Sequence, residues 1–236
     1  AIFYSDYYPR DGKGAGAWCG RFRPQSYDGA MRVQPIVTNV CNMTLPTEDG
    51  GPALQTVDNV LTMFHEFGHA LHSFFRDVQY EGTGGVERDF VELPSQINEH
   101  WAFEPEVLRQ YARHYQTGEV IPQELVEKID ASSKYGQGFA TVEYLAASYV
   151  DLDLHYLTEM PKKLDVMKFQ AEKMRKRGMP SQILPRYSVT NFSHTMGGGY
   201  SAGYYSYIWA EVLDADAFEA FKETGDIFNQ KVAERF

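Results

Sequence analysis

The sequence predicts a mainly α-helical protein with a small N-terminal β-sheet. Two segments within residues 1–50 are rich in β-branched and aromatic residues, whereas helical periodicity dominates residues 51–236. Apolar residues make up 43% of the 236 positions, and 16 Tyr and 15 Phe are spread along the chain. This composition suffices to bury a sizeable core, and it excludes a disordered or fibrous protein.

The first fifty residues are expected to form the small sheet and its loops. Ala1–Tyr8 and Met31–Val40 have the residue content of β-strands. The stretch between them includes a glycine-rich loop, DGKGAGAWCG, at residues 11–20.

Apolar residues recur at helical spacing in eight segments of the remaining chain. The expected helices are Val57–Arg76, Phe90–Ala102, Glu106–Gln116, Pro122–Ala131, Thr141–Thr158, Lys163–Arg177, Ala202–Thr224 and Asp226–Phe236. Two glycine loops interrupt this part of the chain. GTGG at residues 82–85 is interpreted as a turn, whereas GGG at 197–199 is equally a turn or a place where backbone approaches a substrate.

Charge and cysteine content exclude several partners. The net charge of −10 disfavours nucleic acid, and the basic run Lys173–Arg177 is expected to be a solvated helix face. Cys19 and Cys41 fit neither a disulfide framework nor a cysteine metal site, so free thiols in a reducing, cytoplasmic compartment are expected. We expect no membrane partner, because no apolar run approaches the ~20 residues that cross a bilayer.

The motif HEFGH at residues 65–69 predicts a metal site. His65 and His69 are four residues apart, so in a helix their imidazoles project from one face and reach one tetrahedral ion. Glu66 is rotated by ~100° around the helix axis, where its carboxylate reaches a water held by the metal. Gly68 has no side chain and is expected to let a neighbouring element pack close to this helix.

A catalytic zinc needs a third protein ligand, for which Glu92 is the candidate. Pro94 is tolerated only in the first turn of a helix, so Glu92 is expected near a helix start. Asp89 and Glu99 lie three residues before and seven residues after Glu92. Either carboxylate could orient a metal-binding histidine through its second ring nitrogen.

Each of these residues also has an ordinary structural interpretation. HExxH occurs in helices that bind no metal, and Glu92 alone is compatible with a surface carboxylate. His72 lies near the face of the ligands and is interpreted as a packed histidine or one that supports the ligands. His100, His114 and His155 stand in predicted helices without ligand partners and are interpreted as ordinary helix residues.

A tyrosine stripe follows the second glycine loop. Tyr200, Tyr204 and Tyr207 are spaced i, i+4 and i+7, which predicts one face of a helix. Such a stripe is more often part of a core than of a site, and spacing alone favours the core.

Three segments resemble the thimet oligopeptidase family of zinc metallopeptidases. Asp58–His72 (DNVLTMFHEFGHALH) resembles its zinc helix, Arg88–Trp101 (RDFVELPSQINEHW) its third-ligand helix, and Phe192–Trp209 (FSHTMGGGYSAGYYSYIW) its tyrosine-rich substrate motif. Within the family, PSQINEHWA and YARHYQTG are most similar to the peptidyl-dipeptidase branch, also called dipeptidyl carboxypeptidase.

The resemblance implies a zincin-like metallopeptidase catalytic core that hydrolyses short peptides and releases C-terminal dipeptides. The alternatives are an endo-acting oligopeptidase and a non-catalytic module that binds zinc or peptide. The implied site consists of the zinc ligands His65, His69 and Glu92, the base Glu66, and the substrate-site residues His194, Tyr200, Tyr204 and Tyr207.

Within that implied site, Tyr207 is the first choice as hydrogen-bond donor to the reaction's oxyanion, with His194 or Tyr200 assisting. Tyr204 and Arg186 are candidate anchors for a substrate carboxylate. Members of this family are considerably longer, so residues 1–236 are expected to be the catalytic portion of a longer metallopeptidase. Surface left exposed in such a portion is expected to favour self-association.

Overall fold

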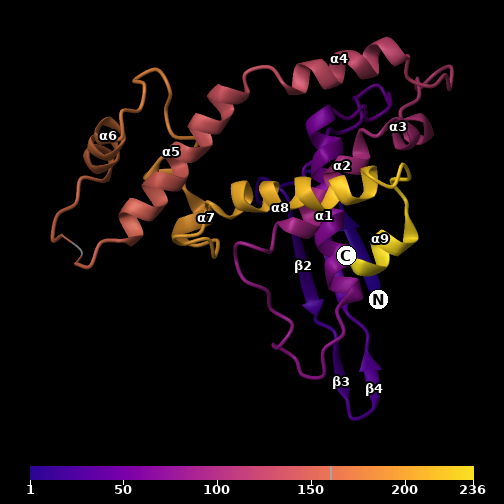
Figure 1. Ribbon diagram of the computed structural model, residues 1–236, viewed down its shortest axis with the longest axis horizontal. Coiled ribbons are helices and arrows are strands. Elements are labelled where there is room, and N and C mark those ends of the chain that lie inside the picture. The colour runs from indigo at the N-terminus through magenta and orange to yellow at the C-terminus, as the bar shows by residue number, and fades with distance from the viewer. Residues whose placement is uncertain (160) are drawn as a thin grey trace. The chain divides into compact units, whose positions relative to one another are not determined.

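The computed structural model describes residues 1–159 and 161–236 (Figure 1). The chain forms two compact units. The first unit comprises residues 1–122 and 210–236, and the second comprises residues 123–209. In the described part of the chain, no helix is both long and apolar enough to cross a membrane.

The first unit begins with a three-stranded sheet and a short hairpin. The sheet has the order β1 (Ile2–Asp6), β5 (Ile36–Val40), β2 (Trp18–Arg23), with β5 parallel to β1 and antiparallel to β2. β3 (Ser26–Asp28) and β4 (Met31–Val33) pair antiparallel in the hairpin. The predicted N-terminal sheet is therefore confirmed.

Two details of the sheet differ from the sequence prediction. The expected strand Met31–Val40 is divided into β4 and β5, because Pro35 between them has no backbone N–H to donate to a ladder. The second difference is that β2 and β3 were not predicted, and β2 begins inside the glycine-rich stretch at residues 11–20.

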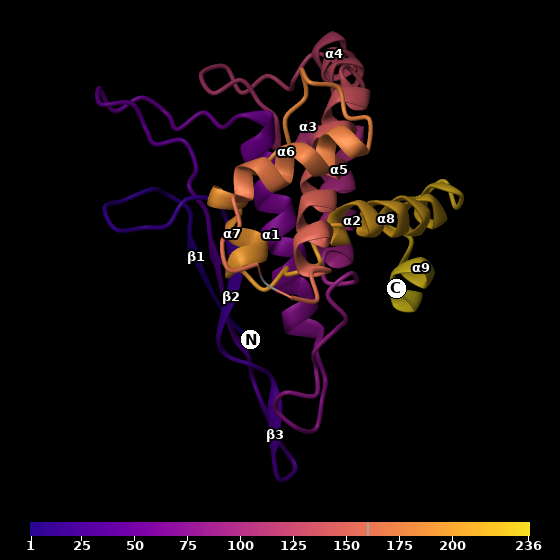
Figure 2. The ribbon, with the colours of Figure 1, turned by 90° about the vertical axis from the view of Figure 1, so that its left-hand side faces the viewer.

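Helix α1 is the central element of the first unit. The helices of this unit are α1 (Val57–Phe75), α2 (Leu93–Ala102), α3 (Pro105–Tyr111), most of α8 (Ser206–Lys222) and α9 (Gln230–Arg235). Figure 2 shows α1 with strands β1 and β2 on one side and α2 on the other. Phe67 and Phe74 of α1 pack edge-on against Phe3 of β1, each with ring centroids 5.7 Å apart, and so anchor the helix to the sheet.

The contact between α1 and α2 depends on Gly68. A Cβ atom at this position would lie 2.7 Å from Cα of Ser95 and would overlap the carbonyl oxygen of Pro94. Both neighbours are backbone atoms of α2, so neither can move aside as a side chain would. The close approach expected at Gly68 is confirmed.

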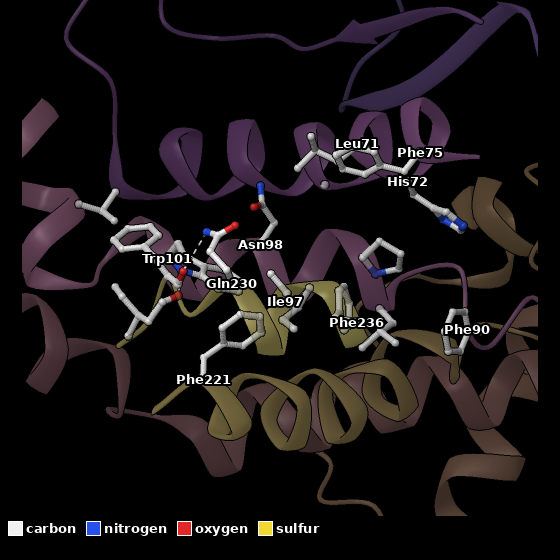
Figure 3. A pocket seen from close by; sticks show the side chains of 17 residues that line it. Leu71, His72, Phe75, Phe90, Ile97, Asn98, Trp101, Phe221, Gln230 and Phe236 are labelled. Atoms are coloured by element: carbon white, nitrogen blue, oxygen red, sulfur yellow. Dashed lines mark hydrogen bonds between the residues drawn. The ribbon is translucent and has the colours of Figure 1, made fainter. Parts of the chain in front are cut away.

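An apolar groove of about 800 Å³ lies among the helices of the first unit. Figure 3 shows Leu71 and Phe75 of α1, Ile97 and Trp101 of α2 and Phe221 of α8 around it. The lining is almost entirely apolar, so the groove is an extension of the core formed by α2, α8 and α9.

The second unit is built around α5 (Gln137–His155). Its other elements are α4 (Gln123–Ser133), α6 (Val166–Lys176), a 3-10 turn at Val189–Asn191, α7 (Ser193–Met196) and the first residues of α8. Ala146 and Val150 of α5 pack against α6 through Met174. Ala147, one residue further round the helix, packs against Phe192 and Tyr204.

All eight predicted helices have a counterpart, with shifted ends. The expected helix Phe90–Ala102 begins only at Leu93, and Glu106–Gln116 already ends at Tyr111. The expected helix Ala202–Thr224 also begins later than predicted, because α8 begins at Ser206. The short helix α7 was not predicted, since four residues are too few to show a period.

We predict that Gly68→Ala lowers the free energy of unfolding by ~1–3 kcal/mol, because the added methyl forces α2 away from α1. Gly138→Ala is the matched control, since Gly138 is also helical and a Cβ there would meet no atom within 4 Å. That control is expected to be neutral or stabilising by up to ~1 kcal/mol. Thermal and urea unfolding measure both, and equal stability of the two variants would contradict the Gly68 contact.

Candidate active site

The two histidines of HEFGH and Glu92 form a cluster of potential metal ligands in the first unit. Nε2 of His65 and Nε2 of His69 each lie 3.2 Å from Oε2 of Glu92. All three ligand atoms lie within 4.8 Å of one another. The helical spacing predicted for the histidines is present, and their rings lie 5.0 Å apart and nearly perpendicular.

Glu92 reaches the histidines because of its place at the start of α2. It is the N-cap residue, with Pro94 in the first turn as expected. Its side chain makes no capping hydrogen bond and is instead directed to the imidazoles. The residue is only 1% exposed, and the Ser95 hydroxyl donates to Oε2 of Glu92 over 3.0 Å. A surface carboxylate is therefore excluded for Glu92.

Of the two carboxylates expected to orient a histidine, the structure places Glu99 in that position. Oε1 of Glu99 lies 2.6 Å from Nδ1 of His65. Since a carboxylate only accepts hydrogen bonds, Nδ1 of His65 carries the proton, and Nε2 is the atom left for a metal. Asp89 lies in the turns before α2 and not in the helix.

The charges of the cluster balance one another. Burial opposes ionisation of Glu92, but hydrogen bonds and the positive charges of His65 and His69 outweigh burial and hold its pKa well below the usual range. Burial likewise disfavours a charged His65, but hydrogen bonds to Glu92 and Glu99 prevail and raise its pKa to about 10. A metal ion that bound here would displace the proton from Nε2 of His65. The positive charge of the metal would then balance the negative charge of Glu92.

Glu66 differs from the other carboxylates of the cluster. It is 5% exposed, and its Oε2 is buried and accepts no hydrogen bond from the described residues. Burial raises its pKa, opposed by the nearby His65 and His69. A carboxylate with a raised pKa and an oxygen without a protein partner is suited to take up a proton.

The donor set fits a divalent transition metal. Two imidazole nitrogens and one carboxylate oxygen converge, one imidazole is oriented by a further carboxylate, and a buried acid lies beside the histidines on α1. Three protein ligands leave positions for water or substrate, as in catalytic metal sites.

The other histidines have structural partners. His72 lines the apolar groove, and burial lowers its pKa. His100 lies 2.7 Å from the buried Asp214 and stacks on Phe218. His114 lies in a turn after α3, not in the expected helix. These positions support a structural role for His72 and His100, whereas the expected helix does not extend to His114.

In the second unit, the tyrosine stripe is not a helical face. Tyr200 and Tyr204 precede α8, and Tyr207 alone of the three is helical, so the spacing argument was wrong. The glycine loop continues through further turns up to Ser206, and this delays the helix. The three residues nevertheless gather in one aromatic cluster with His194.

The cluster has a buried part and an accessible part. Tyr204 is 3% exposed and packs in a buried cluster with Ala147 and Phe192. This burial favours the core interpretation for Tyr204. The rings of Tyr200 and Tyr207 stack with centroids 5.4 Å apart. His194 lies 6.0 Å from the ring of Tyr200 and 6.2 Å from that of Tyr207.

Several residues of the second unit were missed by sequence reasoning. The hydroxyl of Tyr144 donates to the carbonyl oxygen of Tyr204, and Tyr187 packs against His194. Asp151 is 0% exposed and binds the backbone of the tyrosine-rich loop. Asp151 stands four residues after Ala147, on the apolar side of a predicted helix. An acidic residue at such a position was the sequence signal that could have identified it.

Comparisons with known proteins relate the whole chain to one family. The family model described as "Peptidase family M3" matches residues 1–236. The chain is 43% identical to dipeptidyl carboxypeptidase of Escherichia coli K12 over 96% of its length, 40% identical to oligopeptidase A of the same organism over 99%, and 39% identical to probable cytosolic oligopeptidase A of Arabidopsis thaliana over 95%. It spans about a third of these relatives, covering 33%, 35% and 33% of their respective lengths.

We predict a graded loss of metal affinity from two substitutions in the cluster. Glu92→Gln removes the anionic ligand and is expected to abolish stoichiometric metal binding. Glu99→Gln leaves all three ligands in place and is expected to weaken binding by ~10–100-fold, because His65 loses its orienting partner. Metal titration with a competing chelator measures both, and unchanged metal content in Glu92→Gln would remove it from the ligand set.

Proposed function

The chain belongs to peptidase family M3, and from this premise we propose that it carries the zinc-dependent catalytic core of a peptidase that acts on short peptides. The observation that carries the proposal is the convergence of His65, His69 and Glu92 beside the buried acid Glu66. We further propose that the fold is a zincin-like core, since the ligand-bearing helix packs on a small sheet.

We propose that residues 1–236 are the catalytic portion of a longer peptidase. The support is the length of the relatives, of which the chain covers about a third. Turnover is accordingly a property of the full-length peptidase, whereas the metal ligands all lie between residues 65 and 92 of one unit.

The proposed metal is zinc, held by Nε2 of His65, Nε2 of His69 and the Glu92 carboxylate. When bound, zinc lowers the pKa of a coordinated water toward ~7 and polarises the scissile carbonyl. Glu99 keeps the His65 ring in the tautomer that leaves Nε2 free. Glu92 and Glu99 each supply one negative charge, and the two imidazoles are neutral. This arrangement suits a divalent cation.

The proposed proton carrier is Glu66. Its buried Oε2 takes a proton from the attacking water and passes it to the leaving nitrogen, so that water is added across the peptide bond. His194 and Tyr207 are proposed as hydrogen-bond donors to the oxyanion, a role that is worth ~3 kcal/mol for a well-placed donor. Tyr200 is proposed to contact substrate, and the buried Tyr204 to hold the other two rings.

We propose release of C-terminal dipeptides as the reaction, in keeping with the dipeptidyl carboxypeptidase that is 43% identical to the chain. The second candidate is endo-acting cleavage, because oligopeptidase A is 40% identical over 99% of the chain. A non-catalytic module that binds zinc or peptide is the third.

A reducing, cytoplasmic location is proposed on two grounds. Both cysteines are free thiols, and burial raises the pKa of Cys19 to about 12 and that of Cys41 to about 11, which keeps them unreactive. One relative is named a probable cytosolic enzyme.

Self-association of the isolated 236-residue chain also stays a proposal. The apolar groove of the first unit supports it, since Phe75 at its edge is 79% exposed. Light scattering that shows a monodisperse monomer at high concentration would contradict it.

We predict that Glu66→Gln in the full-length peptidase keeps one zinc per chain and loses turnover by ~10²–10⁴-fold, because the amide cannot accept the proton. Metal analysis and hydrolysis of a short peptide measure the two effects. Retained turnover would remove Glu66 as the base, and a wild-type protein that binds zinc and peptide without cleavage would favour the non-catalytic module.

A second prediction separates the two modes of cleavage. A peptide with a free C-terminus is expected to be shortened by two residues at a time, whereas the same peptide with an amidated C-terminus is expected to resist. Mass analysis of the products from both peptides measures this. Equal cleavage at internal bonds in both peptides would replace dipeptide release by endo-acting cleavage.

A further inference from the structure

A buried carboxylate of the second unit holds the loop that carries the tyrosines. Asp151 lies on α5 and is 0% exposed. Its Oδ1 accepts a hydrogen bond from the backbone N–H of Ala202 over 2.9 Å, and its Oδ2 accepts one from the backbone N–H of Tyr204 over 3.0 Å. One carboxylate therefore binds the loop on both sides of Gly203.

The backbone between these two hydrogen bonds is strained. Ala202 has a φ of 54°, and it alone has a positive φ among the described residues other than glycine. The left-handed conformation is costly for a residue with a Cβ and persists only where surrounding contacts impose it. The N–H of Ala202 bound to Asp151 is such a contact.

His155, one turn further along α5, also lies against Asp151. Nδ1 of His155 lies 2.8 Å from Oδ1 of Asp151 and 2.9 Å from the carbonyl oxygen of the same residue. Since both neighbours only accept hydrogen bonds, Nδ1 carries the proton and donates it. The buried carboxylate thus accepts two backbone hydrogen bonds from the loop, while the N–H of His155 is directed to the Asp151 carbonyl oxygen and lies close to Oδ1.

The same helix also holds the far side of Tyr204. The Tyr144 hydroxyl donates to the Tyr204 carbonyl oxygen, while Asp151 accepts from the Tyr204 N–H. Tyr204 in turn packs against the ring of Tyr207, with centroids 5.6 Å apart, and Tyr207 stacks on Tyr200. A displacement of the loop at Tyr204 therefore displaces both rings that are proposed to meet substrate.

We infer that Asp151 is a positioning residue for the peptidase reaction, which acts by holding the Ala202–Tyr204 turn so that Tyr200 and Tyr207 are placed for catalysis. This inference rests on the proposed function. It assigns Asp151 no contact with substrate. A purely structural Asp151 would stabilise the second unit without affecting the turnover of folded protein.

The main test is Asp151→Asn in the full-length peptidase. An amide has one acceptor oxygen and places an NH₂ group against the second backbone N–H, so the turn loses one of its two hydrogen bonds. Amide hydrogen exchange at Ala202 and Tyr204 is expected to accelerate by at least ~10-fold. We expect kcat to fall by ~10–100-fold, because small displacements of catalytic groups have effects of this size, and KM to change by less than ~3-fold.

The matched control is Asp153→Asn on the same helix. Asp153 pairs with Arg177 over 2.8 Å and with Lys173 over 3.6 Å, and makes neither of the two loop hydrogen bonds. This variant also loses a carboxylate and its ion pairs. Its kcat and the exchange at Ala202 and Tyr204 are expected to match the wild type.

A second pair of variants approaches the turn from the loop side, in case Asp151→Asn does not fold. Ala202 is exposed, so a larger side chain there has space but must adopt a positive φ. Ala202→Val is expected to reproduce the loss of kcat, because a β-branched residue is strongly disfavoured in this conformation. Ala202→Gly is expected to keep kcat within ~2-fold, because glycine adopts a positive φ freely.

Two outcomes would overturn the inference. One is unchanged exchange at Ala202 and Tyr204 in Asp151→Asn, and the other is accelerated exchange with unchanged kcat. The proposed function fails separately, if the wild-type peptidase releases no peptide fragments. In that case the exchange measurement still decides whether Asp151 holds the turn.

Discussion

The metal cluster depends on one steric constraint, the absence of a side chain at Gly68. Because backbone atoms of Pro94 and Ser95 fill the space of a Cβ, α2 lies directly on α1 at Gly68, which stands between the two histidines in the sequence. Only at this separation can Glu92, at the very start of α2, bring one oxygen within 3.2 Å of both imidazoles. The same contact places Glu99, two turns along α2, against the far nitrogen of His65.

Charge compensation then determines which groups are reactive. Glu92 and Glu99 are bound to the histidines, so their negative charges are neutralised within the cluster. Glu66 is buried beside them, and its Oε2 accepts no hydrogen bond from the part of the chain that the structure describes. Three carboxylates in one small region thus have three different environments, which differ in hydrogen bonding and burial.

Sequence reasoning identified most of the metal cluster because its residues are linked by local rules. The i, i+4 spacing placed the histidines, and Pro94 placed Glu92 at a helix start. The tyrosine-rich loop was not accessible in this way. The conformation of this loop depends on a positive φ at Ala202 and on Asp151, which lies more than fifty positions earlier in the chain. Local sequence spacing therefore could not predict the loop conformation. The glycines also made helical spacing misleading for Tyr200 and Tyr204. Strand β2 was missed for a related reason, since glycine-rich sequence hides the residues that pair with β5.

X-ray absorption at the zinc edge of the zinc-loaded chain tests the central claim most directly. The account predicts two imidazole nitrogens and at least one carboxylate oxygen at ~2.0–2.2 Å, with no sulfur in the first shell. The three protein donors would be those that α1 and α2 bring together at Gly68. A sulfur ligand from Cys19 or Cys41, or a spectrum with a single imidazole, would show that the packing of these two helices does not build the metal site.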